Sequence, residues 1–365
     1  MSKHSKAREI ARLRLQVQGI SQPRFETPES VVHWLGAVQS QEYGPAKWSV
    51  GQRMHAATDA RLERAVAEGT ILRTHVPRPT WHFILPADIR WMLELTAPRV
   101  RTMLASYDRK LELDDAVYAR SNAVIAQAVE GGNHLTRTEI AAVLESAGLT
   151  ARGQRLGHLV ARAELDRVIC SGAPRGKQQT YASFDERAPG APSLDRDEAL
   201  AELTRRYFTS HGPATVKDFR WWSSLKSADA KRGLDIVGSE LERASIDGRD
   251  YWFAEPQPAT RRVRPRAHLL QGYDEYIVAY TESRHVLNVD GLLGPAPKGA
   301  VSYLHACILD GQVIGHWRHR AGTTAVEVRL LKPLDRTARK TLEDATAAYG
   351  RFLDVPVTLR LVESA

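Results

Sequence analysis

Residues 136–184 read TRTEIAAVLESAGLTARGQRLGHLVARAELDRVICSGAPRGKQQTYASF, and this stretch decides the fold. Thr136 and Glu139 have capping-box spacing, and apolar residues then recur at helical intervals up to a tight glycine-containing turn. We predict a second helix after the turn, at 150–165. Two strands then follow, at 167–170 and 181–184, and a basic, glycine-containing hairpin joins them. Two helices across a short turn, followed by a β-hairpin, are typical of a winged helix.

The same order of elements recurs on either side of this stretch. In the C-terminal copy, three helices precede two strands across Asp247-Gly248, which is a strong hairpin signal. That copy is predicted to have helices starting at 198, 215 and 227 and strands at 241–246 and 250–254. A looser copy near the N-terminus is predicted to have helices at 28–38, after Pro45 and at 58–68, and strands at 71–76 and 80–85.

Residues 261–365 show a different pattern, in which strand-like runs dominate. These runs lie at 268–270, 275–280, 303–309, 312–318, 324–331 and 357–362, with a helix at 336–352. We therefore predict an α+β fold of three tandem winged-helix units followed by a mostly β C-terminal domain. The predicted units are 1–120, 121–190, 191–260 and 261–365, with proline-rich linkers at 188–193 and 255–265.

The composition favours a polyanionic partner. The chain of 365 residues carries 51 Lys and Arg against 43 Asp and Glu, a formal net charge of +8. It has no apolar run of about 18 residues and no apolar signal core, so we expect no membrane span and a cytoplasmic, nucleoid-associated protein. Cys170 and Cys307 lie in separate strand-like runs without a metal-binding motif, so we expect buried thiols and no metal or other cofactor.

Short motifs, in order along nearly the whole chain, carry a family resemblance. The first is the glutamine pair of Val38-Gln-Ser-Gln41, which precedes Tyr43-Gly-Pro and Trp48. The others are Thr74-His-Val-Pro-Arg-Pro-Thr-Trp-His82 with Pro86-Ala-Asp88, Ala163-Glu-Leu-Asp166 with Ser171-Gly172, Gly176-Lys-Gln178 with Tyr181, Tyr207 with Gly212-Pro-Ala-Thr215, Asp218-Phe219 with Trp221-Trp222, Gly272-Tyr-Asp-Glu-Tyr276, and Gly315-His-Trp-Arg318. Together they resemble the AlkZ/YcaQ-type DNA glycosylases.

The resemblance implies tandem winged helices and a β domain arranged in a C-shape around double-stranded DNA. It also implies hydrolysis of the N-glycosidic bond of cationic, alkylated purines. The family includes self-resistance enzymes of antibiotic producers, which unhook bulky DNA adducts, and also members known only as DNA-binding proteins. This sequence departs at one position, because the residue between the glutamines is usually apolar and here it is Ser40.

Gln39 and Gln41 are the predicted catalytic residues. The apolar pattern places them at the end of the helix predicted at 28–38, just before Gly44-Pro45, where unwinding would let the two side chains converge. A neutral amide is no strong base, but it can orient a water molecule toward the sugar C1′. That suffices for a purine whose alkyl group makes it a cationic leaving group. The alternative is a helix end with solvated glutamines.

Four more polar residues are candidates for supporting this site. Glu42 is adjacent and is a candidate base or electrostatic stabiliser, with a solvated carboxylate as the alternative. Thr80 and His82 share one face of a predicted strand, and Arg78 precedes them. This group is expected to line the site or contact phosphates, and a core histidine with satisfied hydrogen bonds is the alternative for His82.

Basic side chains on the predicted recognition helices and hairpins are expected to contact DNA phosphates. Each one alone fits a solvated surface charge equally well, so the prediction concerns the group. The predicted DNA-binding residues are Arg152, Arg155, Arg175, Lys177, Lys217, Arg220 and Arg318.

Two other functions compete with a glycosylase: a winged-helix transcription regulator and a non-catalytic protein that binds DNA lesions. Regulators usually dimerise on palindromic sites, whereas three units in one chain favour a monomer that contacts DNA over a long stretch. No lysine nucleophile is apparent in the sequence, so a monofunctional enzyme is expected.

Overall fold

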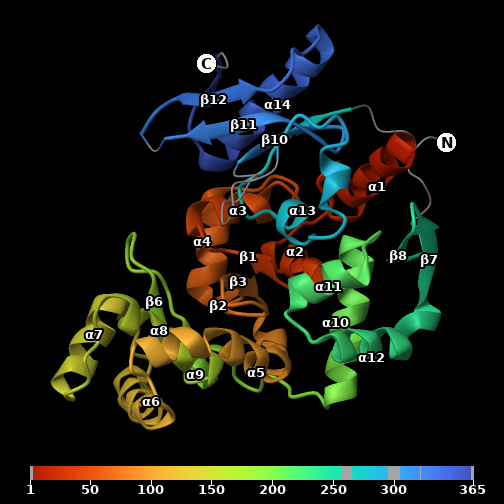
Figure 1. Ribbon diagram of the computed structural model, residues 1–365. Helices are drawn as coiled ribbons and strands as arrows, with labels where there is room; N and C mark the ends of the chain where they lie inside the picture. Colours follow the sequence, from red (N-terminus) through yellow and green to blue (C-terminus); the bar gives the residue numbers. More distant parts are fainter. Residues whose placement is uncertain (1–2, 256–264, 295–304, 321, 363–365) are drawn as a thin grey trace.

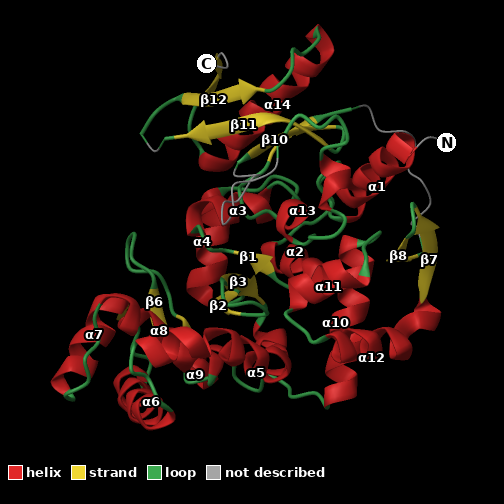
Figure 2. Cartoon of the chain, in the orientation of Figure 1, coloured by secondary structure: helices red, strands yellow, loops and turns green. Residues whose placement is uncertain are grey.

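The computed structural model describes residues 3–255, 265–294, 305–320 and 322–362, and its fold is mixed α/β. The N-terminal repeat unit occupies the centre of Figure 1, the second unit the lower left, the third the lower right and the C-terminal sheet the top. Helices dominate the lower part of the molecule, and the largest group of strands lies at the top (Figure 2).

The first two repeat units have the same order of elements and the same sheet. The first consists of α2 (Pro28–Leu35), β1 (Val38–Gln39), α3 (Tyr43–Gly51), α4 (Asp59–Glu68), β2 (Leu72–His75) and β3 (Trp81–Ile84). The second consists of α6 (Asp115–Val129), β4 (Leu135–Thr136), α7 (Arg137–Ser146), α8 (Gly153–Leu165), β5 (Ile169–Ser171) and β6 (Thr180–Ser183), followed by α9 (Phe184–Arg187). In both sheets the last strand lies in the middle, in the orders β1-β3-β2 and β4-β6-β5.

The third unit repeats this order with a reduced first strand. It consists of α10 (Arg196–His211), α11 (Val216–Ser223), α12 (Ser227–Val237), β7 (Leu241–Ile246) and β8 (Arg249–Ala254), with the 3-10 turn Gly238–Glu240 before β7. A single bridge between Ala214 and Trp252 stands where β1 and β4 stand in the other units. Thr136 and Thr215 each begin a helix with a complete capping box, as the spacing predicted for Thr136.

The helix predicted at 28–38 is shorter than expected. It ends at Leu35 because Gly36 adopts a φ of 77°, which breaks the helical path. Val38 and Gln39 then form β1 and pair with Phe83 and His82 of β3. The glutamine pair therefore does not lie on an unwound helix end, and Gln39 instead lies on a strand.

Two helices were not predicted from the sequence: α1 (Lys3–Val17) and the long α5 (Pro86–Lys110). Helix α5 connects the first two units and buries Ile89, Met92 and Leu93. Its outer side carries Arg99 and the half-exposed Met103, four residues apart and so on one face.

The C-terminal part forms a sheet in the order β13-β12-β11-β10-β9, covered by α14 (Arg336–Leu353). Its strands are β9 (Ala267–Leu269), β10 (Ala306–Leu309), β11 (Gln312–His319), β12 (Ala325–Leu330) and β13 (Thr358–Val362). The strand predicted at 275–280 is wrong, since the short helix α13 (Glu275–Val278) begins there with Asp274 as its cap, followed by the 3-10 turn Arg284–Leu287. Most of the linker predicted at 255–265, and the start of the strand predicted at 303–309, lie outside the described residues.

The core has no feature of a redox or metal centre in the part of the chain that the structure describes. Cys170 and Cys307 are both buried free thiols. No cluster of three or more His, Cys, Asp or Glu side chains suitable for a metal ion occurs among the described residues. Within the same residues, every helix is too short or too polar to cross a membrane.

Candidate active site

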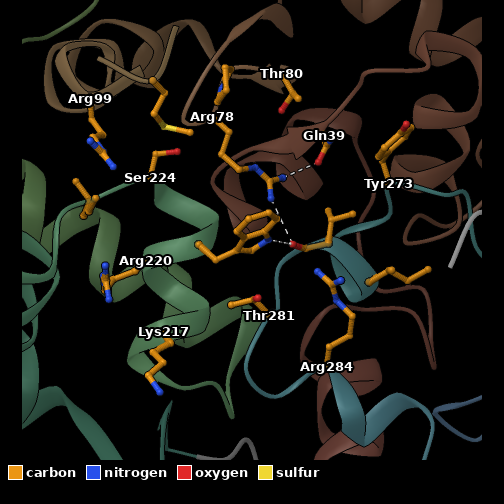
Figure 3. A pocket seen from close by; sticks show the side chains of 16 residues that line it. Gln39, Arg78, Thr80, Arg99, Lys217, Arg220, Ser224, Tyr273, Thr281 and Arg284 are labelled. Atoms are coloured by element: carbon orange, nitrogen blue, oxygen red, sulfur yellow. Dashed lines mark hydrogen bonds between the residues drawn. The ribbon is translucent and has the colours of Figure 1, made fainter. Parts of the chain in front are cut away.

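A cavity of about 760 Å³ opens where the first unit, α5, α11 and the segment around α13 meet. Its wall is mainly apolar, with Met103, Trp221 and Ile277 among the contributors. Polar and charged side chains converge on it from several elements (Figure 3). These polar and charged residues are Gln39, Arg78, Thr80, Arg99, Lys217, Arg220, Ser224, Tyr273, Thr281 and Arg284. No carboxylate occurs among the described residues that line it.

Gln39 reaches the cavity from the end of β1 and is held at both its backbone and its side chain. It is only 5% exposed. Its backbone N–H donates to Oε1 of Glu275 at 2.8 Å. Its side-chain Oε1 accepts from Nη2 of Arg78 at 2.6 Å, as Figure 3 shows. Gln39 is thus fixed between an anion and a cation from distant parts of the chain.

Arg78 comes from the connection between β2 and β3 and is 7% exposed. Besides Gln39, its guanidinium donates to the backbone oxygen of Val278 at 3.3 Å and to Nε2 of His82 at 3.2 Å. Its Nε lies buried without a hydrogen-bond partner. Burial lowers the pKa of Arg78 and the charge of Glu275 opposes this shift, but an arginine stays protonated in proteins.

His82 lies behind Arg78 and is fully buried. Burial, reinforced by the charge of Arg78, lowers the pKa of His82 to about 3. The neutral ring donates from Nδ1 to the backbone oxygen of Thr80 at 2.8 Å, which leaves Nε2 to accept from Arg78. His82 therefore orients Arg78 and is not placed to act as an acid near neutral pH.

We predict that His82 makes the protein less stable on acidification. Its ordinary pKa is 6.5, so below that value the unfolded chain binds a proton that the folded protein does not, and stability falls as the pH falls. Between pH 6.5 and pH 5 this group lowers the free energy of unfolding by about 1.7 kcal/mol, because the histidine of the unfolded chain goes from half to almost fully protonated while the folded ring stays neutral. Urea denaturation at the two pH values measures the loss.

A matched pair of variants assigns this loss to His82. His82→Gln removes the titrating group and should lose most of the pH dependence over this interval. His33→Gln replaces an exposed histidine of α2 and should keep the wild-type dependence. If His82→Gln loses stability on acidification as steeply as the wild type, another group is responsible.

Glu275 belongs to the same group of interacting residues as Gln39 and Arg78, but the sequence predicted no role for it. It is fully buried, and Nε1 of Trp222 donates to its Oε2 at 2.8 Å. Burial alone would raise its pKa, but the neighbouring His211 and Arg78 outweigh burial and hold the pKa of Glu275 at about 2. The motif Gly272-Tyr-Asp-Glu-Tyr276 was the only signal in the sequence that pointed to it.

The structure separates the two predicted catalytic glutamines. Gln41 is exposed and does not line the cavity, and its Oε1 is 3.4 Å from the backbone N–H of Trp81. Glu42 also lies outside the lining, with a carboxylate oxygen 3.6 Å from Nε2 of His305. Thr80 does line the cavity, and its Oγ1 is buried without a partner. The cavity thus brings together Gln39, Arg78 and Thr80.

Two of the predicted DNA-binding residues, Lys217 and Arg220, line the cavity from α11. Lys217 forms an ion pair with Glu282 at 2.6 Å, and its side chain is mostly exposed. Arg99 and Arg284 add positive charge to the same wall, and sequence reasoning missed both. Trp221 of α11 also lines the cavity, is 49% exposed, and donates from Nε1 to the backbone oxygen of Val278.

The other predicted DNA-binding residues lie away from the cavity. Arg152 pairs with Glu145 at 2.7 Å, Arg175 pairs with Glu139 at 2.7 Å, and Arg318 pairs with Glu327. All three side chains are more than half exposed, and Lys177 is exposed at the hairpin turn. Arg155 differs, because it donates to the backbone oxygens of 111, 112 and 150 and so holds the loop before α6.

Comparisons with known proteins identify a matching family, a relative and a solved structure with a similar fold. The family described as DNA glycosylase AlkZ-like matches residues 32–352. An interstrand DNA cross-link repair glycosylase of Streptomyces sahachiroi is 26% identical over 332 residues, which cover 85% of this chain and 87% of that protein. The solved structure of the Streptomyces sahachiroi DNA glycosylase AlkZ has the same fold, with a TM-score of 0.79 at 23% identity over 97% of this chain and 99% of that one.

Proposed function

The chain belongs to the AlkZ-like DNA glycosylase family, and we propose that it hydrolyses the N-glycosidic bond of cationic N7- or N3-alkylated purines in double-stranded DNA. The observation that carries the proposal is the cavity lining, which has an amide, hydroxyls and cations but no carboxylic acid or imidazole among the described residues. Such a lining offers no strong acid to protonate a departing neutral base. It suits a base that alkylation has already made cationic.

Catalysis would then depend on positioning and on the field around the sugar. As the C1′–N bond breaks, positive charge moves from the base to the sugar, and the attacking water loses a proton to solvent. The ionised Glu275 contacts the backbone of Gln39 and supplies negative charge beneath the cavity. We assign the amides of Gln39 and Gln41 to positioning the base and the water, which is consistent with their neutrality.

We further propose that the three repeat units are winged-helix DNA-binding modules, arranged with the C-terminal sheet around the duplex. Their shared order of a helix, a strand or bridge, two helices and two strands supports this assignment. The net charge of +8 and the cations along the cavity wall fit a polyanionic ligand.

We predict that the second unit binds DNA phosphates through Arg152, Arg175 and Lys177. Replacing all three with glutamine should weaken DNA affinity similarly for all sequences. It should also reduce the slope of log K against log salt by about one unit for each phosphate that the variant no longer neutralises. Arg155 is left unchanged because its hydrogen bonds hold the fold of this unit. Fluorescence anisotropy across a salt series measures both effects.

The matched control removes three exposed cations from α14, by changing Arg336, Arg339 and Lys340 to glutamine. This variant loses the same formal charge but should keep the wild-type salt slope to within the error of measurement. Equal slopes in the wild type and the Arg152/Arg175/Lys177 variant would place the DNA on another face.

The proposed substrates include bulky natural-product adducts on guanine N7, as in antibiotic self-resistance, and cross-linked DNA. A relative is named an interstrand cross-link repair glycosylase, which supports this extension. We propose a monomer that works in the cytoplasm on chromosomal DNA. We also propose a monofunctional enzyme, because Lys217, the one lysine among the described residues that line the cavity, has its Nζ engaged in an ion pair with Glu282.

One assay tests the function directly. DNA treated with a methylating agent or a bulky alkylating agent is incubated with the protein, and released bases and alkali-labile abasic sites are measured. Release of alkylated purines, without borohydride trapping of the protein on DNA, is the expected result. Protection of one defined sequence without base release would indicate a regulator, and lesion binding without release would indicate a non-catalytic member.

A further inference from the structure

The orientation of the Gln39 amide is fixed by its partner. An arginine has hydrogen-bond donors only, so the group that faces Nη2 of Arg78 at 2.6 Å must be the amide oxygen. The donor group of the same amide, Nε2, is then the part left for a ligand in the cavity that Gln39 lines. We propose that Gln39 acts as a hydrogen-bond donor to an acceptor atom of the departing purine, and that Arg78 is the positioning residue that sets this orientation.

A further atom points to the same kind of ligand. Oγ1 of Thr80 is buried without a hydrogen-bond partner, and Thr80 lines the cavity beside Gln39. Buried polar groups are normally paired, so an unpaired one in a cavity wall marks where a ligand completes the pairing. The amide N–H groups of Gln39 and the hydroxyl of Thr80 form a donor set. Its complement is an acceptor edge, such as O6 or N3 of guanine.

The donor role has a consequence for the reaction. When the C1′–N9 bond breaks, its electron pair passes into the purine ring and the acceptor atoms O6 and N3 gain negative charge. Hydrogen bonds from Gln39 strengthen as this charge develops and therefore stabilise the transition state more than the bound substrate. The water oxygen forms the new bond to C1′ and its proton passes to solvent. A water held only by donors would have its lone pairs occupied, so Gln39 is unsuited to hold the nucleophile.

The decisive variant is Gln39→Glu, which keeps the shape of the side chain but has no N–H groups. It should lower the single-turnover rate of N7-methylguanine release by about 10²-fold, and an acceptor role for Gln39 would instead leave the rate equal or higher. Gln127→Glu is the matched control, because it makes the same change at an exposed residue of α6. Thermal unfolding checks that the variants remain folded.

Arg78 is tested through its coupling to Gln39. Arg78→Met should lower the maximal single-turnover rate about tenfold or more and leave DNA affinity nearly unchanged, and Arg78→Lys should recover part of the rate. Because Arg78 is inferred to act through Gln39, the variant Gln39→Ala/Arg78→Met should be no slower than Gln39→Ala alone. Multiplicative losses in the double variant would overturn the positioning role, and so would an unchanged rate in Arg78→Met.

Substrate analogues identify the acceptor atom. Replacing N3 of the methylated guanine with C–H, or O6 with hydrogen, removes one acceptor at a time. Each enzymatic rate is divided by the spontaneous rate of the same lesion. The enzymatic advantage should fall for one analogue in the wild type but not in Gln39→Ala, and equal falls in both proteins would contradict a bond from Gln39.

The inference rests on the proposed function, and the outcomes separate the two. A wild-type protein that releases no alkylated base from any substrate contradicts the proposed function. A wild-type protein that is active together with an equally active Gln39→Glu contradicts only the donor role of Gln39.

Discussion

Gln39→Ala is expected to slow the excision of N7-methylguanine by about 10²-fold or more, a loss of about 3 kcal/mol of transition-state stabilisation. The amide stands in the cavity wall, fixed by Arg78 and Glu275, so its truncation removes a positioned group rather than a mobile one. DNA binding should persist, because phosphate contacts carry most of the affinity and a neutral amide makes none of the charged ones. Single-turnover base release and anisotropy measure the two quantities separately.

Gln41→Ala should also reduce excision by about 10²-fold, for a different reason. Gln41 is exposed, and its oxygen has only a long contact with the backbone of Trp81, which leaves an acceptor for a water at the sugar. The controls are the folded state of each variant and its unchanged DNA affinity. Wild-type rates in both variants would remove the glutamine pair from the mechanism and direct attention to Glu42 or to Thr80.

Local patterns in the sequence located most elements of the repeat units. The helix starts at Thr136 and Thr215 follow from capping residues and apolar spacing, which depend only on neighbours within one turn. The hairpin at Asp247-Gly248 similarly follows from its turn residues, which both adopt positive φ. Such features are legible because the residues that decide them are adjacent in the chain.

The failures have equally specific causes. The mostly apolar stretch from Val31 to Val38 is compatible with either a helix or a strand. Gly36 ends the helix, and Val38 then begins a strand. Residues 275–280 are uniformly buried, which removes the periodicity that distinguishes a short helix from a strand. Here the Asp274 cap decides for a helix, and it accepts from the backbone N–H of Tyr276.

Local sequence patterns could not predict the geometry of the site. The residues that hydrogen-bond to Gln39 are far from it in the sequence: Arg78 is 39 positions away and Glu275 is 236 positions away. Family motifs placed these residues in separate blocks of sequence, but no spacing rule predicts that the blocks touch. The separation of Gln41 from Gln39 has the same origin, because it depends on how β1 pairs with β3 and on what packs above it.

Substrate choice should show the largest effect of all. We expect N7-methylguanine and N3-methyladenine to be released at least about 10³-fold faster than uracil, 8-oxoguanine or O6-alkylguanine in the same duplex, a difference of about 4 kcal/mol or more. Neutral lesions need a proton donor or another strong activator for the leaving group. The described lining of the cavity contains no carboxylic acid or imidazole to serve as that proton donor, and His82 is buried, with burial holding its pKa at about 3.

Bulk on the alkyl group should matter far less than charge. The cavity of about 760 Å³ is largely apolar and lies between elements of several units, with Trp221 and Met103 in its wall, so an added aromatic or aliphatic group finds apolar surface. A panel containing N7-methylguanine, N3-methyladenine, a bulky N7-guanine adduct and uracil tests both expectations. Rates should follow leaving-group quality, measured as spontaneous depurination, more closely than adduct size. Efficient release of uracil would require an acid that this cavity does not present and would contradict the mechanism.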